Sequence, residues 1–129
     1  MEGALVFVGG RNIANINRVV NMIKEINGNA EPLILDVTKS ENIEGEFYKI
    51  FDKYGRIDIL VNNAGGSARE KSRKLVEQEI DIINMLLDSN LKGTIMCCKF
   101  VAKYMIEKKC GKIINIGSTT GIQGNDRNV

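Results

Sequence analysis

Four short, mostly apolar runs divide the sequence, and stretches with helical periodicity separate each run from the next. The runs are residues 4–8, 32–35, 57–61 and 113–116. Runs of this length with no polar alternation are typical of strands that are buried on both faces of a sheet. Because strands joined by helices of ten or more residues need crossover connections, the sequence predicts a parallel sheet. The predicted class is therefore α/β, in a single domain that spans residues 1–129.

The first two connecting segments each carry one apolar stripe. The first stripe is Ile13, Ile16, Val20 and Ile23, and the second is Ile43, Phe47, Ile50 and Tyr54. Spacings of three and four place such side chains on one face of a helix. Residues 27–29 stop the first helix, with Gly28 suited to the left-handed position past its end, and Gly55 closes the second.

The third connecting segment is longer, and it predicts a loop followed by two helical stretches. Residues 66–73 are polar and contain glycine, so we expect a loop before a helix over residues 76–88. The second stretch crosses Gly93. Its apolar stripe is Leu91, Ile95, Cys98, Ala102 and Met105. Residues 118–129 are mostly polar and have no clear period, which indicates a loop or a frayed end.

Composition excludes several classes of function. The net charge of +2, from 18 basic and 16 acidic residues, offers no footprint for nucleic acid or an anionic membrane. The sequence has no histidine, which excludes a Ser-His-Asp hydrolase and a histidine-ligated metal site. The three cysteines have no metal-binding spacing, so we expect free thiols in a reducing cytoplasm. No run is long enough to span a membrane, and none has the features of a secretory signal.

Two strings at strand ends carry the most specific information. Residues 60–65 read Leu-Val-Asn-Asn-Ala-Gly, and residues 113–118 read Ile-Ile-Asn-Ile-Gly-Ser. Asn90 lies between them, within Ser-Asn-Leu-Lys-Gly. Together these strings resemble the classical short-chain dehydrogenase/reductase family, and the resemblance extends over essentially the whole chain. Gly121 and the pair at 124–125, Gly-Asn, make the β-ketoacyl carrier-protein reductases the most similar subgroup.

The resemblance implies a Rossmann-like, doubly wound dinucleotide-binding domain. It also implies an oxidoreductase that uses NAD(P)(H) on a small-molecule carbonyl or alcohol substrate, without a metal. Ser118 would form a hydrogen bond to the reacting oxygen of the substrate. Asn90 would hold a water molecule in a proton relay. These two residues are the candidate catalytic residues.

The same resemblance implies a cofactor site. Asp36 would accept a hydrogen bond from the adenine amino group, and Val37 would pack beside the ring. The residues along the adenosine ribose would be Asn63, Ala64 and Gly65. Arg11 occupies the turn where the family reads the 2′ position, and a guanidinium suits a 2′-phosphate. NADP is therefore the predicted cofactor, with NAD as the alternative.

Each of these residues also has a purely structural interpretation, which stays open. The two asparagines of the first string could pin a strand end through bonds to the backbone. Asp36 could be the N-terminal cap of the next helix. Arg11 could be a solvated turn residue, and Ser118 an ordinary loop residue. Cys97 and Cys98 have no nearby base, so core packing is favoured over reactivity.

Two parts of the family pattern are absent from the sequence. No T-G-x-x-x-G-I-G turn precedes the first strand, and Ser118 is not followed by the family's tyrosine and lysine, which supply the proton. Tyr104 lies in another helix. We therefore expect a partial member, truncated at both ends, with no turnover by the 129 residues alone. The main alternative is a non-catalytic nucleotide-binding or dimerising module that uses the helix over residues 90–109.

The strand order is also open. The family's first strand would lie between the strands at 4–8 and 57–61, so an incomplete sheet of four strands would expose two edges, which favours aggregation. Either these strands close up in the order 2-1-3-4, or another chain supplies the missing strand. A partner chain that also supplied the tyrosine would rebuild an enzyme from two pieces.

Overall fold

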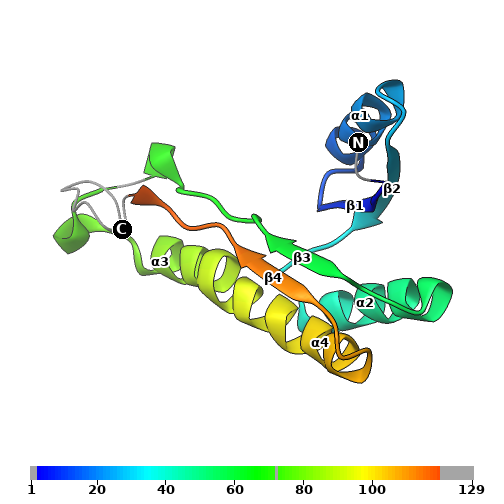
Figure 1. The fold of residues 1–129 in the computed structure, drawn as a ribbon. Coiled ribbons are helices and arrows are strands. Elements are labelled where there is room, and N and C mark those ends of the chain that lie inside the picture. Colours follow the sequence, from blue (N-terminus) through cyan, green and yellow to red (C-terminus); the bar gives the residue numbers. More distant parts are fainter. Residues whose placement is uncertain (1–2, 72, 120–129) are drawn as a thin grey trace. The chain divides into compact units, whose positions relative to one another are not determined.

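The computed structural model describes residues 3–71 and 73–119 (Figure 1). The chain divides into two compact units between Asp36 and Val37. Both units combine helices with parallel strands, so the predicted α/β class is confirmed. The single domain over residues 1–129 stays a prediction. Gly121, Gly124 and Asn125, which indicated the subgroup, lie outside the described residues.

The first unit is one strand-helix-strand motif. It consists of β1 (Leu5–Gly10), α1 (Ile13–Glu25) and β2 (Asn29–Ile34). The strands pair in parallel, from Leu5 opposite Asn29 to Gly10 opposite Ile34. The buried side chains that hold the motif together are Ile16, Val20 and Ala30. Two members of the predicted helical stripe thus form the core of this unit.

The end of α1 differs in one detail from the prediction. The residue in the left-handed region is Asn27, with φ 58°, and not Gly28. The N–H of Asn27 donates to the carbonyl of Lys24, and the N–H of Gly28 donates to the carbonyl of Ile23, both at 2.9 Å. This pair of bonds is a Schellman motif, in which asparagine can replace glycine. Gly28 is needed because a Cβ there would lie 2.6 Å from the Ile23 side chain.

The second unit contains the remaining elements. They are α2 (Ser40–Tyr54), β3 (Ile59–Asn62), α3 (Ile80–Leu86), a π-helical turn (Leu87–Lys92), α4 (Gly93–Glu107) and β4 (Lys112–Asn115). A short 3₁₀ helix at Leu75–Glu77 replaces the first part of the predicted 76–88 helix, and another at Arg69–Lys71 lies within the predicted loop over residues 66–73. The left-handed Gly55, with φ 70°, ends α2 as predicted.

Helices α2 and α4 pack against each other and form the core of the second unit. Ile43 on α2 and Val101 on α4 are fully buried. The rings of Phe51 and Tyr104 stack across the same contact, with centroids 4.4 Å apart. Contacts between α4 and β3 then attach the strand pair to the helices.

The strands form two separate two-stranded sheets. β1 pairs with β2, and β3 pairs with β4, both in parallel. The parallel arrangement is therefore confirmed, and the fold is that of an incomplete Rossmann-like domain. The strands β1 and β2 belong to the first unit and β3 and β4 to the second, so the closed order 2-1-3-4 stays a prediction.

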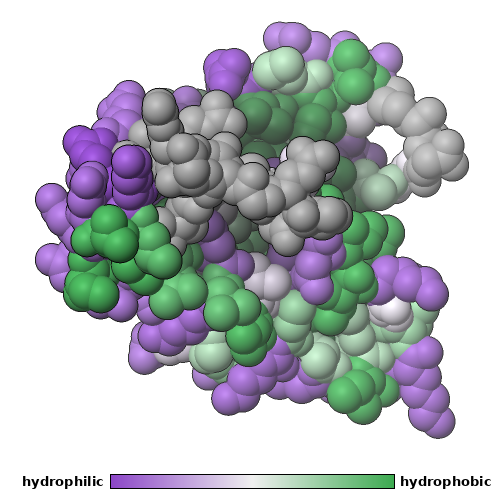
Figure 2. All heavy atoms as spheres, turned by 90° about the vertical axis from the view of Figure 1, so that its left-hand side faces the viewer, coloured by the Kyte–Doolittle hydropathy of each residue, from purple (hydrophilic) through white to green (hydrophobic). Residues whose placement is uncertain are grey.

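The apolar stripe of the last helical segment is also corrected. Leu91 and Ile95 are each 55% exposed, and the large buried side chains of α4 are Cys97, Val101, Tyr104 and Met105. The physical reason is tertiary, because α4 packs against α2 with Tyr104 stacked on Phe51, and this contact selects which face of α4 is buried. Figure 2 shows hydrophobic residues lying among hydrophilic ones on one face of the molecule.

Candidate functional site

Most of the predicted site residues lie at the carboxyl ends of β3 and β4, where ligands bind in open parallel sheets. Asn63, Ala64 and Gly65 follow β3 directly. Ser118 follows β4 and is exposed. Asn90 lies in the π-helical turn between α3 and α4.

Asn90 is bound to the loop that follows β3. Its Nδ2 donates to the carbonyl of Gly66 at 2.8 Å, and the N–H of Gly66 donates to its Oδ1 at 3.0 Å. A Cβ at Gly65 would lie only 3.0 Å from the same Oδ1, so glycine permits this close approach. One amide side chain therefore joins the Asn63–Gly65 segment to the helix.

Neighbouring hydroxyl groups hold Asn90 in place. Ser89 Oγ donates to the carbonyl of Met85 and can also donate to Asn90 Oδ1, each at 3.0 Å. Thr94 Oγ1 donates to the main-chain carbonyl of Asn90 at 2.9 Å. π-Helical turns occur frequently at functional sites. The structure thus places Asn90 at the site, and its water-relay role stays a prediction.

Val37 lies under the start of α4. A Cβ added at Gly93 would be 2.9 Å from both Val37 Cγ2 and the Val37 carbonyl oxygen. Asp36 is half-buried beside it. The interpretation of Asp36 as the helix cap is wrong, since α2 begins at Ser40 and Lys39 is its N-cap residue. The adenine roles of Asp36 and Val37 stay predictions.

Arg11 belongs to the first unit. It helps line a hollow of about 340 Å³ at the carboxyl end of β1, together with Gly10, Asn12 and Asn15. The Asn12 side chain caps α1 by accepting from the N–H of Asn15 at 3.0 Å. The first turn of α1 has no acidic side chain, so no carboxylate there opposes an anion beside Arg11.

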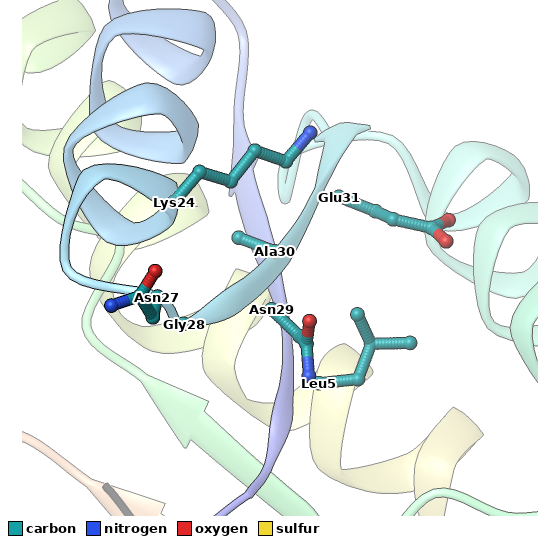
Figure 3. Close-up of a pocket in the computed structure, with 7 residues that line it drawn as sticks. All are labelled: Leu5, Lys24, Asn27, Gly28, Asn29, Ala30 and Glu31. Atoms are coloured by element: carbon teal, nitrogen blue, oxygen red, sulfur yellow. The ribbon is translucent and has the colours of Figure 1, made fainter.

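A larger hollow, of about 650 Å³, lies at the opposite ends of β1 and β2 (Figure 3). Its lining includes Leu5, Lys24 and Glu31. In Figure 3 the side chains of Lys24 and Glu31 both extend to the right of the view and end at separate places. Because dinucleotides bind at the carboxyl ends of parallel strands, the smaller hollow beside Arg11 is the better candidate.

Among residues 3–71 and 73–119, no cluster of three histidine, cysteine or acidic side chains could hold a metal ion. Within the same described ranges, no helix has the length and apolar character needed to cross a membrane.

Comparison with known proteins identifies the family. Residues 1–129 match the family described as short chain dehydrogenase. The chain belongs to this family. The 3-oxoacyl-[acyl-carrier-protein] reductase FabG of Thermotoga maritima is 36% identical over 124 residues, which cover 96% of this chain and 49% of the relative. The chain therefore spans about half the length of the curated relatives it matches.

Solved structures of family members have the same fold. The structure described as ElxO with NADP bound is 34% identical, with a TM-score of 0.84, and the match covers 95% of this chain and 48% of that one. An NAD⁺-bound xylitol dehydrogenase is 25% identical, with a TM-score of 0.88, over 98% of this chain and 48% of that one. The family fold is thus shown, and its members include proteins with either dinucleotide.

Sequence reasoning missed four residues that shape this site. They are Gly66, Gly93, Cys98 and Asn115. Gly93 was noticed only as an interruption of a helical stripe, although a glycine inside a helix often marks a close contact. Asn115 stands in an otherwise apolar strand, and this contrast was a usable signal.

Proposed function

We propose that this chain forms the nucleotide-binding part of an oxidoreductase that acts on a carbonyl or alcohol group with NADP(H). The observation that carries the proposal is the pair of hydrogen bonds between Asn90 and Gly66. They hold the Asn63–Gly65 segment beside the helix at the carboxyl end of β3. In this proposal, Asn63, Ala64 and Gly65 contact the adenosine ribose, and Asp36 and Val37 contact the adenine.

The preference for NADP depends on Arg11. A guanidinium matches a phosphate through paired charge-assisted hydrogen bonds, whereas NAD has only ribose hydroxyls at this position. The relatives include ElxO with NADP bound and an NAD⁺-bound xylitol dehydrogenase, so either dinucleotide occurs in the family. NAD is therefore the alternative cofactor.

Calorimetric titration with NADPH and NADH tests the cofactor proposal. We expect tighter binding of NADPH, and Arg11→Glu should weaken it about tenfold or more, because such charged bonds contribute about 1.5–3 kcal/mol. Arg18→Glu is the matched control, because Arg18 is an exposed arginine on α1 outside the hollow. Equal affinity for both nucleotides, unchanged in Arg11→Glu, would contradict the NADP preference.

In the catalytic part of the proposal, Ser118 binds the substrate oxygen and Asn90 orders a water molecule. The three tyrosines of the sequence, Tyr48, Tyr54 and Tyr104, lie on α2 and α4. No tyrosine therefore accompanies Ser118 to donate a proton, a contribution typically of about 10²- to 10⁴-fold. We expect no steady oxidation of NADPH by the 129 residues alone with a panel of ketones. Measurable turnover would contradict this expectation.

A dimerising module is the second candidate, and a specific surface favours it. Leu87, Leu91 and Ile95 are exposed at intervals of one helical turn along the π-helical turn and α4. A second copy packed against this stripe would bury it. Leu91→Lys should then lower the molar mass measured by light scattering, and Val76→Lys, another exposed apolar position, should not. A monomeric wild-type chain would rule this candidate out.

The proposed location is the cytoplasm. All three cysteines, Cys97, Cys98 and Cys110, are free thiols, which suits a reducing compartment. Recovery of the native protein from a membrane or extracellular fraction would contradict this location.

A further inference from the structure

Side chains from three different elements meet on the face of the β3–β4 sheet that α4 covers. They are Asn62 at the end of β3, Asn115 at the end of β4 and Cys98 on α4. Asn62 Nδ2 lies 2.8 Å from Asn115 Oδ1 and 3.2 Å from Cys98 Sγ. Cys98 Sγ lies 3.8 Å from the same Asn115 oxygen.

The donors and acceptors of this cluster match. An asparagine amide has two N–H groups, and those of Asn62 are used by Asn115 and Cys98. The thiol of Cys98 can in turn donate to Asn115 Oδ1. Asn62 is only 9% exposed, so loss of either acceptor would leave a buried N–H without a partner.

The position of the cluster on the sheet points to its role. Asn62 and Asn115 are opposite each other, and the preceding pair on the same face, Leu60 and Ile113, is apolar. A purely structural contact with α4 would be served by apolar side chains at both levels. The polar pair instead stands at the carboxyl end, next to the candidate site.

Each element of the cluster leads directly to a site residue. β3 continues into Asn63, β4 continues towards Ser118, and the helix with Cys98 begins at the π-helical turn with Asn90. The N–H of Ile116 also donates to the Asn62 carbonyl at 2.9 Å, which extends the strand pairing past β4. The cluster therefore ties the three elements together where the site begins.

We propose that Asn115 and Cys98 are positioning residues, which hold the loop after β3 and the segment leading to Ser118 in register through Asn62. Neither residue touches the nucleotide in this proposal. That these residues affect nucleotide affinity rests on the proposed function. That they order the two strand ends is independent of the proposed function.

Hydrogen exchange read by mass spectrometry tests the positioning role on the full chain without nucleotide. Asn115→Leu removes the acceptor of Asn62, and exchange should rise about tenfold or more in residues 63–66 and 116–118. Exchange in α1, which belongs to the other unit, should stay unchanged. An equal rise throughout α2 and α4, or no rise at all, would overturn the proposal.

Conservative variants separate positioning from general packing. Cys98→Ala loses both the acceptor and the donor, whereas Cys98→Ser keeps a hydroxyl that can serve as either. We expect Cys98→Ala to raise local exchange and Cys98→Ser to restore most of the protection. Cys110→Ala is the matched control, because Cys110 is exposed and should leave these segments unaffected. Equal effects of Ser and Ala at position 98 would exclude Cys98 from the role.

NADPH titration gives the second readout. Asn115→Leu should weaken binding about fivefold or more under conditions where the chain is fully folded, and Asn115→Asp, which keeps an acceptor oxygen, should restore most of it. If the wild-type chain binds no NADPH, the proposed function fails, and the exchange experiment still decides the positioning role. If NADPH binds equally well to wild type and Asn115→Leu, the link from the cluster to the site is wrong.

Discussion

Gly93 offers a sharp test of how α4 lies against the segment after β2. Its φ of −56° and ψ of −46° are ordinary helical values, so alanine would suit the backbone. The added Cβ would nevertheless lie 2.9 Å from Val37 Cγ2 and 2.9 Å from the Val37 carbonyl oxygen. We therefore expect Gly93→Ala to destabilise the chain, although alanine is normally the better helix former.

Two opposing contributions decide the magnitude. Replacing glycine by alanine in a helix stabilises by about 0.8–1.0 kcal/mol. Overpacking by one methyl group costs about 1–3 kcal/mol. Because one of the two close atoms is a backbone oxygen, which cannot rotate away, the cost should fall in the upper part of that range. The expected net loss in the free energy of unfolding is about 1–2 kcal/mol.

Urea unfolding, followed by circular dichroism, measures this loss. Gly45→Ala in α2 is the matched control, because a Cβ there meets no atom within 4 Å and the helix should gain about 0.8–1.0 kcal/mol. Both glycines lie in the second unit, so the two variants report on the same structure. Adding Val37→Ala to Gly93→Ala should recover only part of the loss, since the carbonyl remains. Equal stabilisation by Gly93→Ala and Gly45→Ala would refute the reasoning.

Three further outcomes follow from the structure. Asn90→Ala removes both bonds to Gly66, so NADPH affinity measured by calorimetry should fall about fivefold or more, while Asn90→Asp, which keeps the acceptor, should lose less. Burial raises the pKa of the Cys97 thiol from 9.0 to about 11, with Cys98 as a smaller cause. Between these values the unfolded thiol ionises and the folded one stays protonated, so the free energy of unfolding should fall as the pH rises from 9 to 11, and Cys97→Ala should remove that part of the pH dependence. Ile43→Ala should cost about 2–5 kcal/mol in urea unfolding, whereas Tyr48→Ala, at an exposed position of the same helix, should change the stability by less than about 0.5 kcal/mol.

The kinds of element could be predicted because they depend on local periodicity. The spacing of Ile16 and Val20 predicts α1, and both side chains are buried in its core. The left-handed end of α2 at Gly55 follows from the same local rules. At the end of α1, asparagine and glycine are adjacent, and either can occupy the left-handed position. Asn27 takes the left-handed position because Gly28 lies in close contact with Ile23. The spacing of apolar residues in the sequence does not reveal this contact.

The π-helical turn could not be predicted in the same way. A π-helical turn contains more residues than an α-helical turn. A tertiary contact accompanies it here, because the Asn90 side chain binds the backbone of Gly66, which lies in a loop far away in the sequence. The predicted stripe from Leu91 to Met105 begins with two exposed positions, Leu91 and Ile95. Successive residues of an α-helix point in different directions, so Cys97 lies in the core while its neighbour Cys98 joins a polar cluster.

For the site, the sequence strings predict which residues gather, but not which atoms they use. The water-holding role of Asn90 stays a prediction, and the structure adds that both polar atoms of its side chain bind Gly66. Backbone bonding was one open interpretation of Asn62, and its amide binds the side chains of Asn115 and Cys98. In both cases the asparagine joins two elements of the second unit. Order at the strand ends therefore rests on side-chain amides, so single-residue changes should alter nucleotide affinity more than they alter the global free energy of unfolding.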